Sequence, residues 1–302
     1  MMPDVHVAVS NSTLLGECPA WDERQQVLYW VDIEGKLIHR YDPSDGTDQS
    51  RQTSGRPGSF AFTTDPAVLL VAMENELRWF HWESGRSEVF IALEPPGNGN
   101  RLNDGKTDRV GRFVVGSMHE NPNDGRATGT LYSVEADGSF NVVRDHIGVT
   151  NGLGFDAVRR RAFFADTHTR KIERYDYDQD TGQFTNEQLF FDYGDIPGLP
   201  DGACVDSEGC YWSASVFGWA VIRISPDGEV IDRISVPVEK PSMPAFGGVD
   251  YRTLYITTIG MGGSRPSADG LDDAMPGSLF TVDLEVAGLP EATFAGEPPE
   301  FS

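Results

Sequence analysis

Short apolar segments recur along the whole chain, and each is separated from the next by a turn rich in Asp, Gly, Ser or Thr. The segments "VLYWV", "RFVVG", "AFFAD" and "LYITT" are examples. Each follows a shorter apolar segment across a turn, which is the pattern of a β-hairpin. A second hairpin comes next, as in "LIHRYDPSDG", "LYSVEADG" and "VIRISPDG", where an Asp-Gly type turn follows the strand. The pattern therefore predicts hairpins in successive pairs.

The first hairpin of each pair is repeated six times at a nearly constant spacing. Aligned on an aspartate five positions further on, the copies begin at Glu17, Phe60, Asn103, Asn151, Asp201 and Ala245, which are 43, 43, 48, 50 and 44 residues apart. Such a period indicates a repeat fold, and two hairpins per unit make a four-stranded blade. We predict an all-β protein, a six-bladed β-propeller of four-stranded antiparallel blades, forming a single domain over residues 1–302. The segment "VHVAVS" at residues 5–10 should complete the last blade and close the ring.

Composition and charge limit the kinds of partner that this protein is expected to bind. No run approaches the roughly 20 apolar residues that a membrane helix needs, and the N-terminus lacks the pattern of a signal peptide, so we expect a cytoplasmic protein with no membrane contact. The net charge of -23 argues against nucleic acid, because such a field repels phosphate. Cys18, Cys204 and Cys210 lack a CxxC spacing, which argues against a disulfide framework and a zinc-cysteine site. We expect a monomer or weak oligomer that binds a small neutral ligand or a cation.

The residues at the head of each repeat suggest where such a ligand binds. The first strand of a propeller blade lines the central channel, so the six head residues should meet near the channel mouth. Four of them carry side-chain oxygen atoms: Glu17, Asn103, Asn151 and Asp201. Oxygen ligands suit Ca²⁺, Mg²⁺ or Mn²⁺, and a bound cation would offset the cost of two buried carboxylates. The alternative is that these residues only form turns before strands, although Glu17 is a poor turn former.

Several of these segments together resemble a known family. "LLGECPAWD", "RLNDGKTDRVGRFVVGSM", "TNGLGFD", "PDGACVDSEGCYW" and "FGGVDYRTLYITT" are similar to the gluconolactonase/regucalcin (senescence marker protein) family of metal-dependent six-bladed propellers. The resemblance covers most of the chain. It implies a hydrolase that opens the lactone of a sugar acid, such as a gluconolactone-type aldonolactone, to the aldonic acid.

The resemblance also implies roles for individual residues. Glu17, Asn151 and Asp201 would bind one divalent metal ion, with Ca²⁺ favoured and Zn²⁺, Mn²⁺, Mg²⁺ or Fe²⁺ as alternatives. Arg101 and Asn103 would contact the substrate. Asn121, in the loop "SMHENPNDG", stands where some animal members have a glutamate that contacts substrate, so the sugar contacts of this loop are expected to differ.

The chemistry of lactone opening requires an electrophile and a base. A divalent cation polarises the lactone carbonyl and lowers the pKa of a nearby water. Asp201 is the favoured base, because it would lie near both the metal and the water, although metal ligation lowers its basicity. Two other functions stay open: an esterase or phosphotriesterase like the diisopropylfluorophosphatase-like propellers, and a non-catalytic calcium-binding propeller. Arg101 and the polar loop favour the sugar. Residues 260–277 are expected to form a long loop, which is either a lid or merely an irregular segment.

Overall fold

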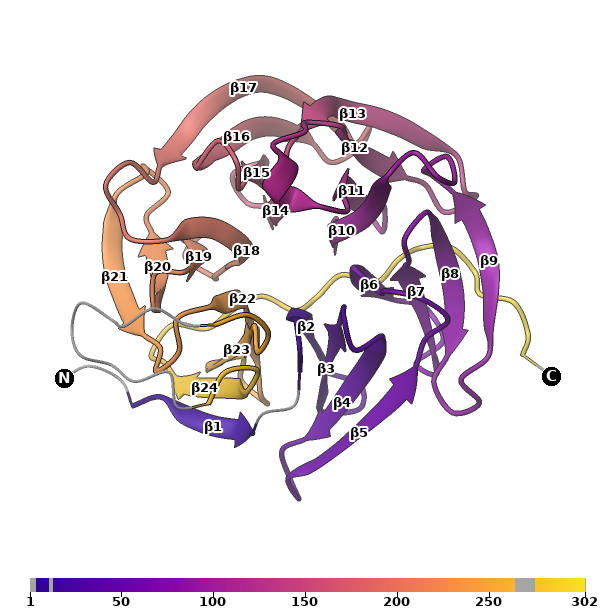
Figure 1. Cartoon of the computed structure of the whole chain (residues 1–302), viewed down its shortest axis with the longest axis horizontal. Coiled ribbons are helices and arrows are strands. Elements are labelled where there is room, and N and C mark those ends of the chain that lie inside the picture. Colours follow the sequence, from indigo (N-terminus) through magenta and orange to yellow (C-terminus); the bar gives the residue numbers. More distant parts are fainter. Residues whose placement is uncertain (1–3, 11–12, 264–274, 302) are drawn as a thin grey trace.

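The computed structural model describes residues 4–10, 13–263 and 275–301 and shows a six-bladed β-propeller (Figure 1). Six antiparallel sheets of four strands each surround one central channel. The predicted fold is confirmed. The central part of the candidate lid at 260–277 lies outside the described residues.

The strands fall into four concentric layers. The innermost strands are β2 (Gly16–Asp22), β6 (Ser59–Phe62), β10 (Asn100–Thr107), β14 (Thr150–Asp156), β18 (Leu199–Val205) and β22 (Pro241–Gly247). The second layer is β3 (Val27–Asp32), β7 (Val68–Ala72), β11 (Phe113–His119), β15 (Arg161–Asp166), β19 (Tyr211–Val216) and β23 (Thr253–Thr258). The third is β4 (Leu37–Asp42), β8 (Glu76–His81), β12 (Gly129–Val134), β16 (Lys171–Asp178), β20 (Ala220–Ile224) and β24 (Leu279–Asp283). The outermost is β5 (Thr47–Gln52), β9 (Ser87–Ala92), β13 (Phe140–Ile147), β17 (Gln183–Asp192), β21 (Val230–Ser235) and β1 (His6–Val9). A short 3-10 helix, η1 (Pro122–Asp124), lies between β11 and β12.

The last blade is built from both ends of the chain. Strand β1 pairs antiparallel with β24, which places His6 opposite Thr281 and Val9 opposite Leu279. The order of this sheet is β1-β24-β23-β22. The prediction that the N-terminal segment completes the sixth blade is confirmed, and the ring closes through this pairing.

Burial decreases from the channel to the rim of each blade. Every residue of β3 is buried, whereas β5 in the same blade is mostly exposed. The described residues form six hydrophobic clusters, one at each interface between neighbouring blades. Because the second-layer strands are covered by a blade on either side, several of them appear in the sequence as continuous apolar runs rather than alternating ones, as in β3 and β7.

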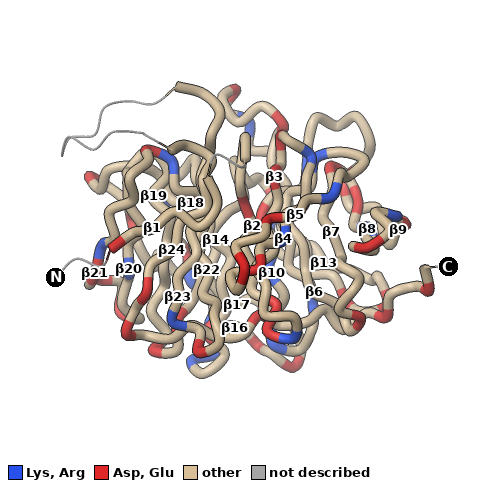
Figure 2. The backbone as a smooth tube through the Cα atoms, turned by 90° about the horizontal axis from the view of Figure 1, so that it is seen from below, with Lys and Arg blue, Asp and Glu red and all other residues tan. Residues whose placement is uncertain are grey.

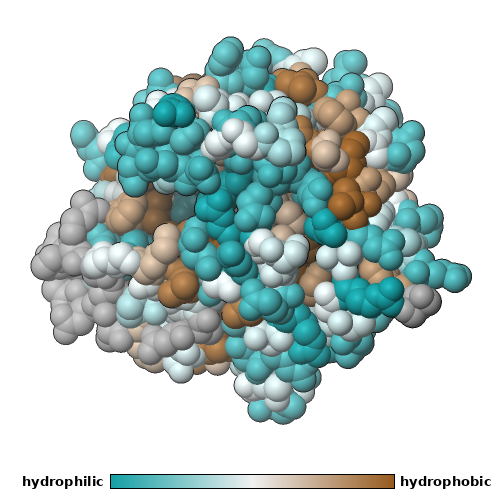
Figure 3. Space-filling view, turned by 45° about the vertical axis from the view of Figure 1, so that its right-hand side comes forward, coloured by the Kyte–Doolittle hydropathy of each residue, from teal (hydrophilic) through white to brown (hydrophobic). Residues whose placement is uncertain are grey.

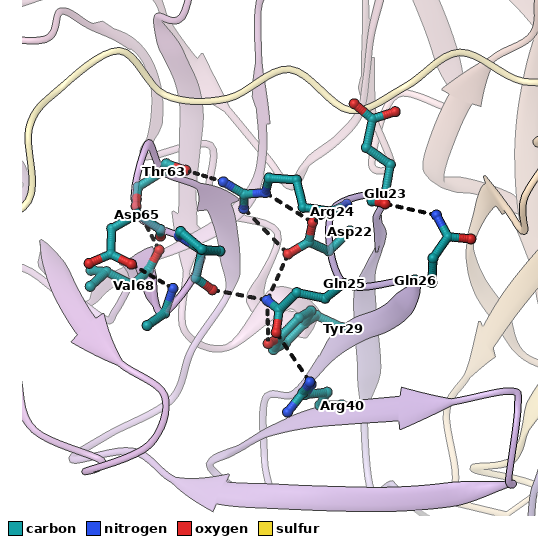
Figure 4. Close-up of polar contacts among 12 residues, drawn as sticks. Asp22, Glu23, Arg24, Gln25, Gln26, Tyr29, Arg40, Thr63, Asp65 and Val68 are labelled. Carbon is teal, nitrogen blue, oxygen red and sulfur yellow. Dashed lines mark hydrogen bonds and ion pairs between the residues drawn. The ribbon is translucent and has the colours of Figure 1, made fainter.

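The aspartate that marks each repeat stabilises the turn after the inner strand. Asp22 accepts hydrogen bonds from the backbone N–H of Arg24 at 2.9 Å and from the side chain of Gln25 at 2.9 Å (Figure 4). Arg24 also donates to the carbonyl oxygen of Thr63 in the next blade, at 2.8 Å. The equivalent aspartates of three other repeats also accept hydrogen bonds from backbone N–H groups of the following turn; they are Asp108, Asp156 and Asp206. The sequence signature therefore reflects turns at the end of the channel opposite the head residues.

The chain after β24 crosses this opposite end of the channel (Figure 1). Lys106, from the inner strand β10, donates to Glu291 of this C-terminal tail at 2.7 Å. Phe294 is fully buried, and its backbone N–H donates to the carbonyl oxygen of Phe62 at 2.8 Å. The tail therefore closes the channel on the side away from the head residues.

The surface is acidic and largely hydrophilic. Asp and Glu positions are spread over both ends and the sides of the propeller (Figure 2). The face in Figure 3 is mainly hydrophilic, with hydrophobic side chains in a few separate patches. No described helix is long and apolar enough to cross a membrane. The three cysteines are free and buried.

Candidate functional site

β-bulges interrupt the inner strands beside the four oxygen-bearing head residues. The register breaks fall between Glu17 and Ala20, Leu102 and Gly105, Asn151 and Gly154, and Pro200 and Ala203. Strand β6, which carries the apolar head residue Phe60, pairs with β7 without a break, and Ala245 lies in a regular part of β22. A bulge breaks the alternation of side chains and re-aims one of them. The polar head residues thus occur where the backbone departs from a regular strand.

The backbone turns sharply after two of these residues. Cys18, which follows Glu17, has φ 48°, and Gly152, which follows Asn151, has φ 65°. Positive φ is costly for a residue with a side chain, and such strain concentrates at functional sites. At Gly152 a side chain is also excluded by space, because a Cβ there would lie 2.4 Å from the hydroxyl oxygen of Tyr211.

A chain of hydrogen bonds connects three inner strands at the channel mouth. Arg101 donates from Nη1 to Oδ1 of Asn103 at 2.6 Å, and Asn103 donates from Nδ2 to Oδ1 of Asn151 at 3.3 Å. Asn151 in turn donates to the hydroxyl of Thr167 at 2.8 Å, and Thr167 donates to the carbonyl oxygen of Pro200 at 2.8 Å. This series of hydrogen bonds therefore runs from β10 through β14 to the residue before Asp201. It orients the amide oxygen of Asn151, and both Oδ1 and Nδ2 of Asn103 form hydrogen bonds within it.

Glu17 and Asp201 are carboxyl groups whose charged forms the protein itself does little to stabilise. The pKa of Glu17 is raised well above its ordinary value, first by burial and then by repulsion from Asp201 and Asp104. The pKa of Asp201 is also raised well above its ordinary value, by burial and by Asp104, and Arg101 opposes both shifts only weakly. Neither carboxylate forms an ion pair among the described residues. After burial, repulsion from Asp201 is the largest cause of the raised pKa of Glu17.

Asp104 is a third acidic group at this site, and our sequence reasoning missed it. Its Oδ2 atom accepts from the backbone N–H of Leu153 at 3.0 Å, whereas Oδ1 is buried without a hydrogen-bond partner among the described residues. Asp104 follows Asn103 inside the same bulge, so both side chains can lie near the channel. The "ND" pair, with two polar residues at the head of one repeat, was the available signal.

Two further aspartates position the strands that carry Glu17 and Asn151. Asp32, at the end of β3, accepts from the backbone N–H groups of Leu14 and Leu15 at 2.9 and 3.0 Å. Asp166, at the end of β15, does the same for Gly148 and Val149, both at 3.0 Å. The sequence contained a signal for them, because each ends an apolar run, "LYWVD" and "AFFAD".

The predicted substrate-contacting residues have different surroundings. Arg101 is only 7% exposed, and burial followed by repulsion from Arg56 lowers its pKa to about 10, so it stays charged at neutral pH. Asn121 is exposed, and its side chain caps η1 by accepting from the backbone N–H of Asn123 at 3.2 Å. The structure thus joins Arg101 to the head residues directly, while Asn121 supports its own loop at the channel mouth.

The donor set fits a divalent cation. Glu17 and Asp201 offer carboxylate oxygens and Asn151 offers a carboxamide oxygen, which are the ligands that hard cations prefer. A cation would also offset the repulsion that raises both carboxyl pKa values. Among the described residues no three Asp, Glu, His or Cys side chains group as a metal site, so this set depends on the amide oxygen.

Residues 15–260 match the model of the family described as the SMP-30/Gluconolactonase/LRE-like region. The chain belongs to this family. The match includes Glu17, Asn151 and Asp201 together with Arg101 and Asn103, so the resemblance seen in the sequence is confirmed for the region that carries the candidate site.

Several known proteins are similar to this chain over nearly its whole length. A 6-deoxy-6-sulfogluconolactonase of Pseudomonas putida is 39% identical over 292 residues, which are 95% of this chain and 97% of that protein. A pentonolactonase of Haloferax volcanii is 35% identical over 285 residues, which are 94% of this chain and 95% of that protein. The crystal structure of a calcium-binding protein, regucalcin, from Agrobacterium tumefaciens has a TM-score of 0.88 at 26% identity, covering 97% of both chains.

Proposed function

We propose that this protein hydrolyses a sugar lactone to the aldonic acid with the help of one divalent metal ion. The observation that carries the proposal is the pair of uncompensated carboxylates, Glu17 and Asp201, beside the amide oxygen of Asn151 and the buried Arg101. The similarity to two lactonases over more than nine tenths of the chain supports the same reaction.

Glu17, Asn151 and Asp201 would hold the ion, and Ca²⁺ is the favoured one because all three donors are oxygen atoms. The similar protein of known structure is described as calcium-binding, which supports the same choice. When bound, a divalent ion polarises the lactone carbonyl and makes a nearby water more acidic.

Asp201, Arg101 and Asn103 would carry out the other steps of the reaction. Asp201 accepts a proton from the attacking water, whose oxygen forms the new bond to the carbonyl carbon. The bond from that carbon to the ring oxygen breaks, and Asp201 returns the proton to the ring oxygen as it leaves. Arg101 donates hydrogen bonds to the substrate from the guanidinium nitrogens that have no partner among the described residues. Asn103 would orient Arg101 and Asn151, and its hydrogen bond to Arg101 supports a role in contacting the substrate.

A metal-reconstitution assay tests the proposal. Protein stripped with a chelator is reloaded with Ca²⁺, Mg²⁺, Mn²⁺, Zn²⁺ or Fe²⁺ and assayed on six-carbon and five-carbon aldonolactones. We expect hydrolysis above the spontaneous rate with at least one ion and none with the stripped protein. Spontaneous rates with every ion would contradict the proposal.

The second candidate function is calcium binding without catalysis, which the description of the Agrobacterium tumefaciens protein favours. Calcium binding by calorimetry, with no acceleration of any lactone, would support it. An esterase or phosphotriesterase is less favoured, because the charged Arg101 lies buried where that chemistry would require a wider apolar pocket.

A further inference from the structure

Arg56 lies at the channel mouth among three carboxylates. Its guanidinium nitrogens lie 3.7 Å from Glu34, 3.5 Å from Glu74 and 3.4 Å from Glu120. Arg56 precedes β6, and the three glutamates come from the β3–β4, β7–β8 and β11–β12 loops, which belong to three adjacent blades. We refer to these four residues as the Arg56 cluster.

The cluster borders the candidate site at the strand that carries Arg101 and Asn103. The backbone carbonyl of Glu74 accepts from the backbone N–H of Leu102 at 2.8 Å. Gly58, two residues after Arg56, packs so closely on β10 that a Cβ there would lie 2.9 Å from the Cα of Asn103. The electrostatics agree, because Arg56 lowers the pKa of Arg101 while Glu34 and Glu74 oppose that shift.

The cluster has an excess of acceptors over donors. Three carboxylates and one guanidinium give a formal charge of -2, so Arg56 does not neutralise its partners. The three ion pairs are longer than an ordinary N–H···O hydrogen bond of about 2.9 Å, which leaves carboxylate oxygens able to accept from other donors. All three carboxylates keep solvent access, with 33, 32 and 56% of their side chains exposed for Glu34, Glu74 and Glu120. The buried Arg101 beside them has guanidinium nitrogens without a partner among the described residues.

We propose that the Arg56 cluster is a specificity subsite for the part of the lactone that is remote from the reacting carbonyl. It binds neutral hydroxyl groups, which donate to its carboxylates and accept from Arg56, and it disfavours lactones that carry a carboxylate, sulfonate or phosphate at that end. This inference rests on the proposed lactonase function. It narrows the substrate class to neutral polyhydroxy lactones.

The expected discrimination follows from Coulomb's law. One like charge at roughly 7 Å in water weakens binding of an anion about threefold, and two carboxylates without a neutralising partner weaken it about tenfold. Because the charged Arg101 lies beside the cluster and leaves one net negative charge there, we expect kcat/KM for a neutral aldonolactone to exceed that for the same lactone with a terminal anionic group by about threefold. The difference should lie mainly in KM and should shrink as salt is raised, because these charges are partly exposed.

The test compares gluconolactone with its 6-deoxy-6-sulfo analogue in three proteins. The proteins are the wild type, the double variant Glu34→Gln/Glu120→Gln, and a control, Glu83→Gln, in the exposed β8–β9 turn at the opposite end of the propeller. The double variant replaces two carboxylates by amides, which accept weaker hydrogen bonds, so kcat/KM for the neutral lactone should fall by about two- to tenfold. For the sulfonated lactone it should rise about tenfold, whereas the control should leave both values unchanged.

The outcomes separate the subsite from the reaction. A wild type that prefers the sulfonated lactone, or a double variant with an unchanged ratio between the two lactones, would overturn the subsite and leave the lactonase proposal standing. Failure of the wild type to hydrolyse either lactone in any metal-loaded form would contradict the lactonase proposal instead. Should the double variant not fold, Glu120→Gln alone, at the most exposed of the three positions, should give a rise of about threefold for the sulfonated lactone.

Discussion

The C-terminal tail should contribute to the stability of the propeller through one buried aromatic residue, Phe294. The ring of Phe294 is fully buried, with centroid distances of 5.8 Å to both Trp79 and Phe90. It belongs to the hydrophobic cluster between the second and third blades. The substitution Phe294→Ala removes this ring without touching Glu291 or the candidate site.

The magnitude follows from burial and from the size of the chain. Replacing a fully buried Phe by Ala costs about 3–5 kcal/mol, because transfer and cavity terms add. The unfolding entropy of a chain of 302 residues is about 0.63 kcal/mol/K, at roughly 2.1 cal/mol/K per residue. A loss of about 4 kcal/mol therefore lowers Tm by about 6 °C. The control Val158→Ala, at a turn residue that is 86% exposed, should lower Tm by less than about 1 °C.

The assay is thermal unfolding of both variants at one heating rate, together with lactone hydrolysis at 25 °C. Hydrolysis by Phe294→Ala should match the wild type, since Phe294 packs with the tail at the far end of the channel. A Tm decrease no larger than that of Val158→Ala would refute the reasoning, because it would mean that the tail detaches without affecting the blades. Limited proteolysis in the tail at 25 °C would identify that detached state.

Three further predictions concern the candidate site. Asp201→Asn should lower turnover more than metal affinity, whereas Glu17→Gln should chiefly weaken metal binding; equal losses of metal, with normal turnover at saturating metal, would remove Asp201 from the role of base. Asn103→Ala should lower both metal affinity and kcat/KM about 10- to 100-fold by freeing Arg101 and Asn151, as measured by calorimetry and kinetics, and an unchanged metal affinity would contradict the link. The pKa values of Glu17 and Asp201 are raised in the folded metal-free protein, so above about pH 4 it binds more protons than the unfolded chain does. The stability of the metal-free protein should therefore fall as the pH rises from about 4 towards 7. Saturating Ca²⁺ should remove this fall, so identical trends of Tm between pH 5 and 7.5 with and without Ca²⁺ would argue against an ion at these carboxylates.

The sequence predicts the propeller well because its repeat is carried by turns that depend on local chemistry. Asp22 and its equivalents accept hydrogen bonds from residues two to four positions further on, so the same short motif reappears in successive blades. The closing strand β1 was also predictable, since an apolar segment before the first repeat has a place only in the last blade. These features need no knowledge of distant residues.

The roles within the candidate site were harder to predict, because they depend on bulges. Residues next to each other on a regular strand face opposite sides, so Asp104 would be expected to point away from the side of Asn103. The bulge between Leu102 and Gly105 removes that rule, and Asp104 then adds to the charge around Glu17. Aligning the head residues likewise placed Asn103 with the candidate ligands, but its hydrogen bonds to Arg101 and Asn151 depend on packing between blades.

The charges along the channel explain why a cation belongs at one end and not at the other. Towards the tail, burial alone would lower the pKa of Lys106, but attraction to Glu291 outweighs it and the pKa is raised. Lys106 in turn counteracts the rise in the pKa of Asp104 that burial causes. Acid and base are thus matched within the chain at that end. At the mouth, Glu17 and Asp201 repel each other with only weak relief from Arg101, so the folded chain gains most from a positive charge that it does not itself supply.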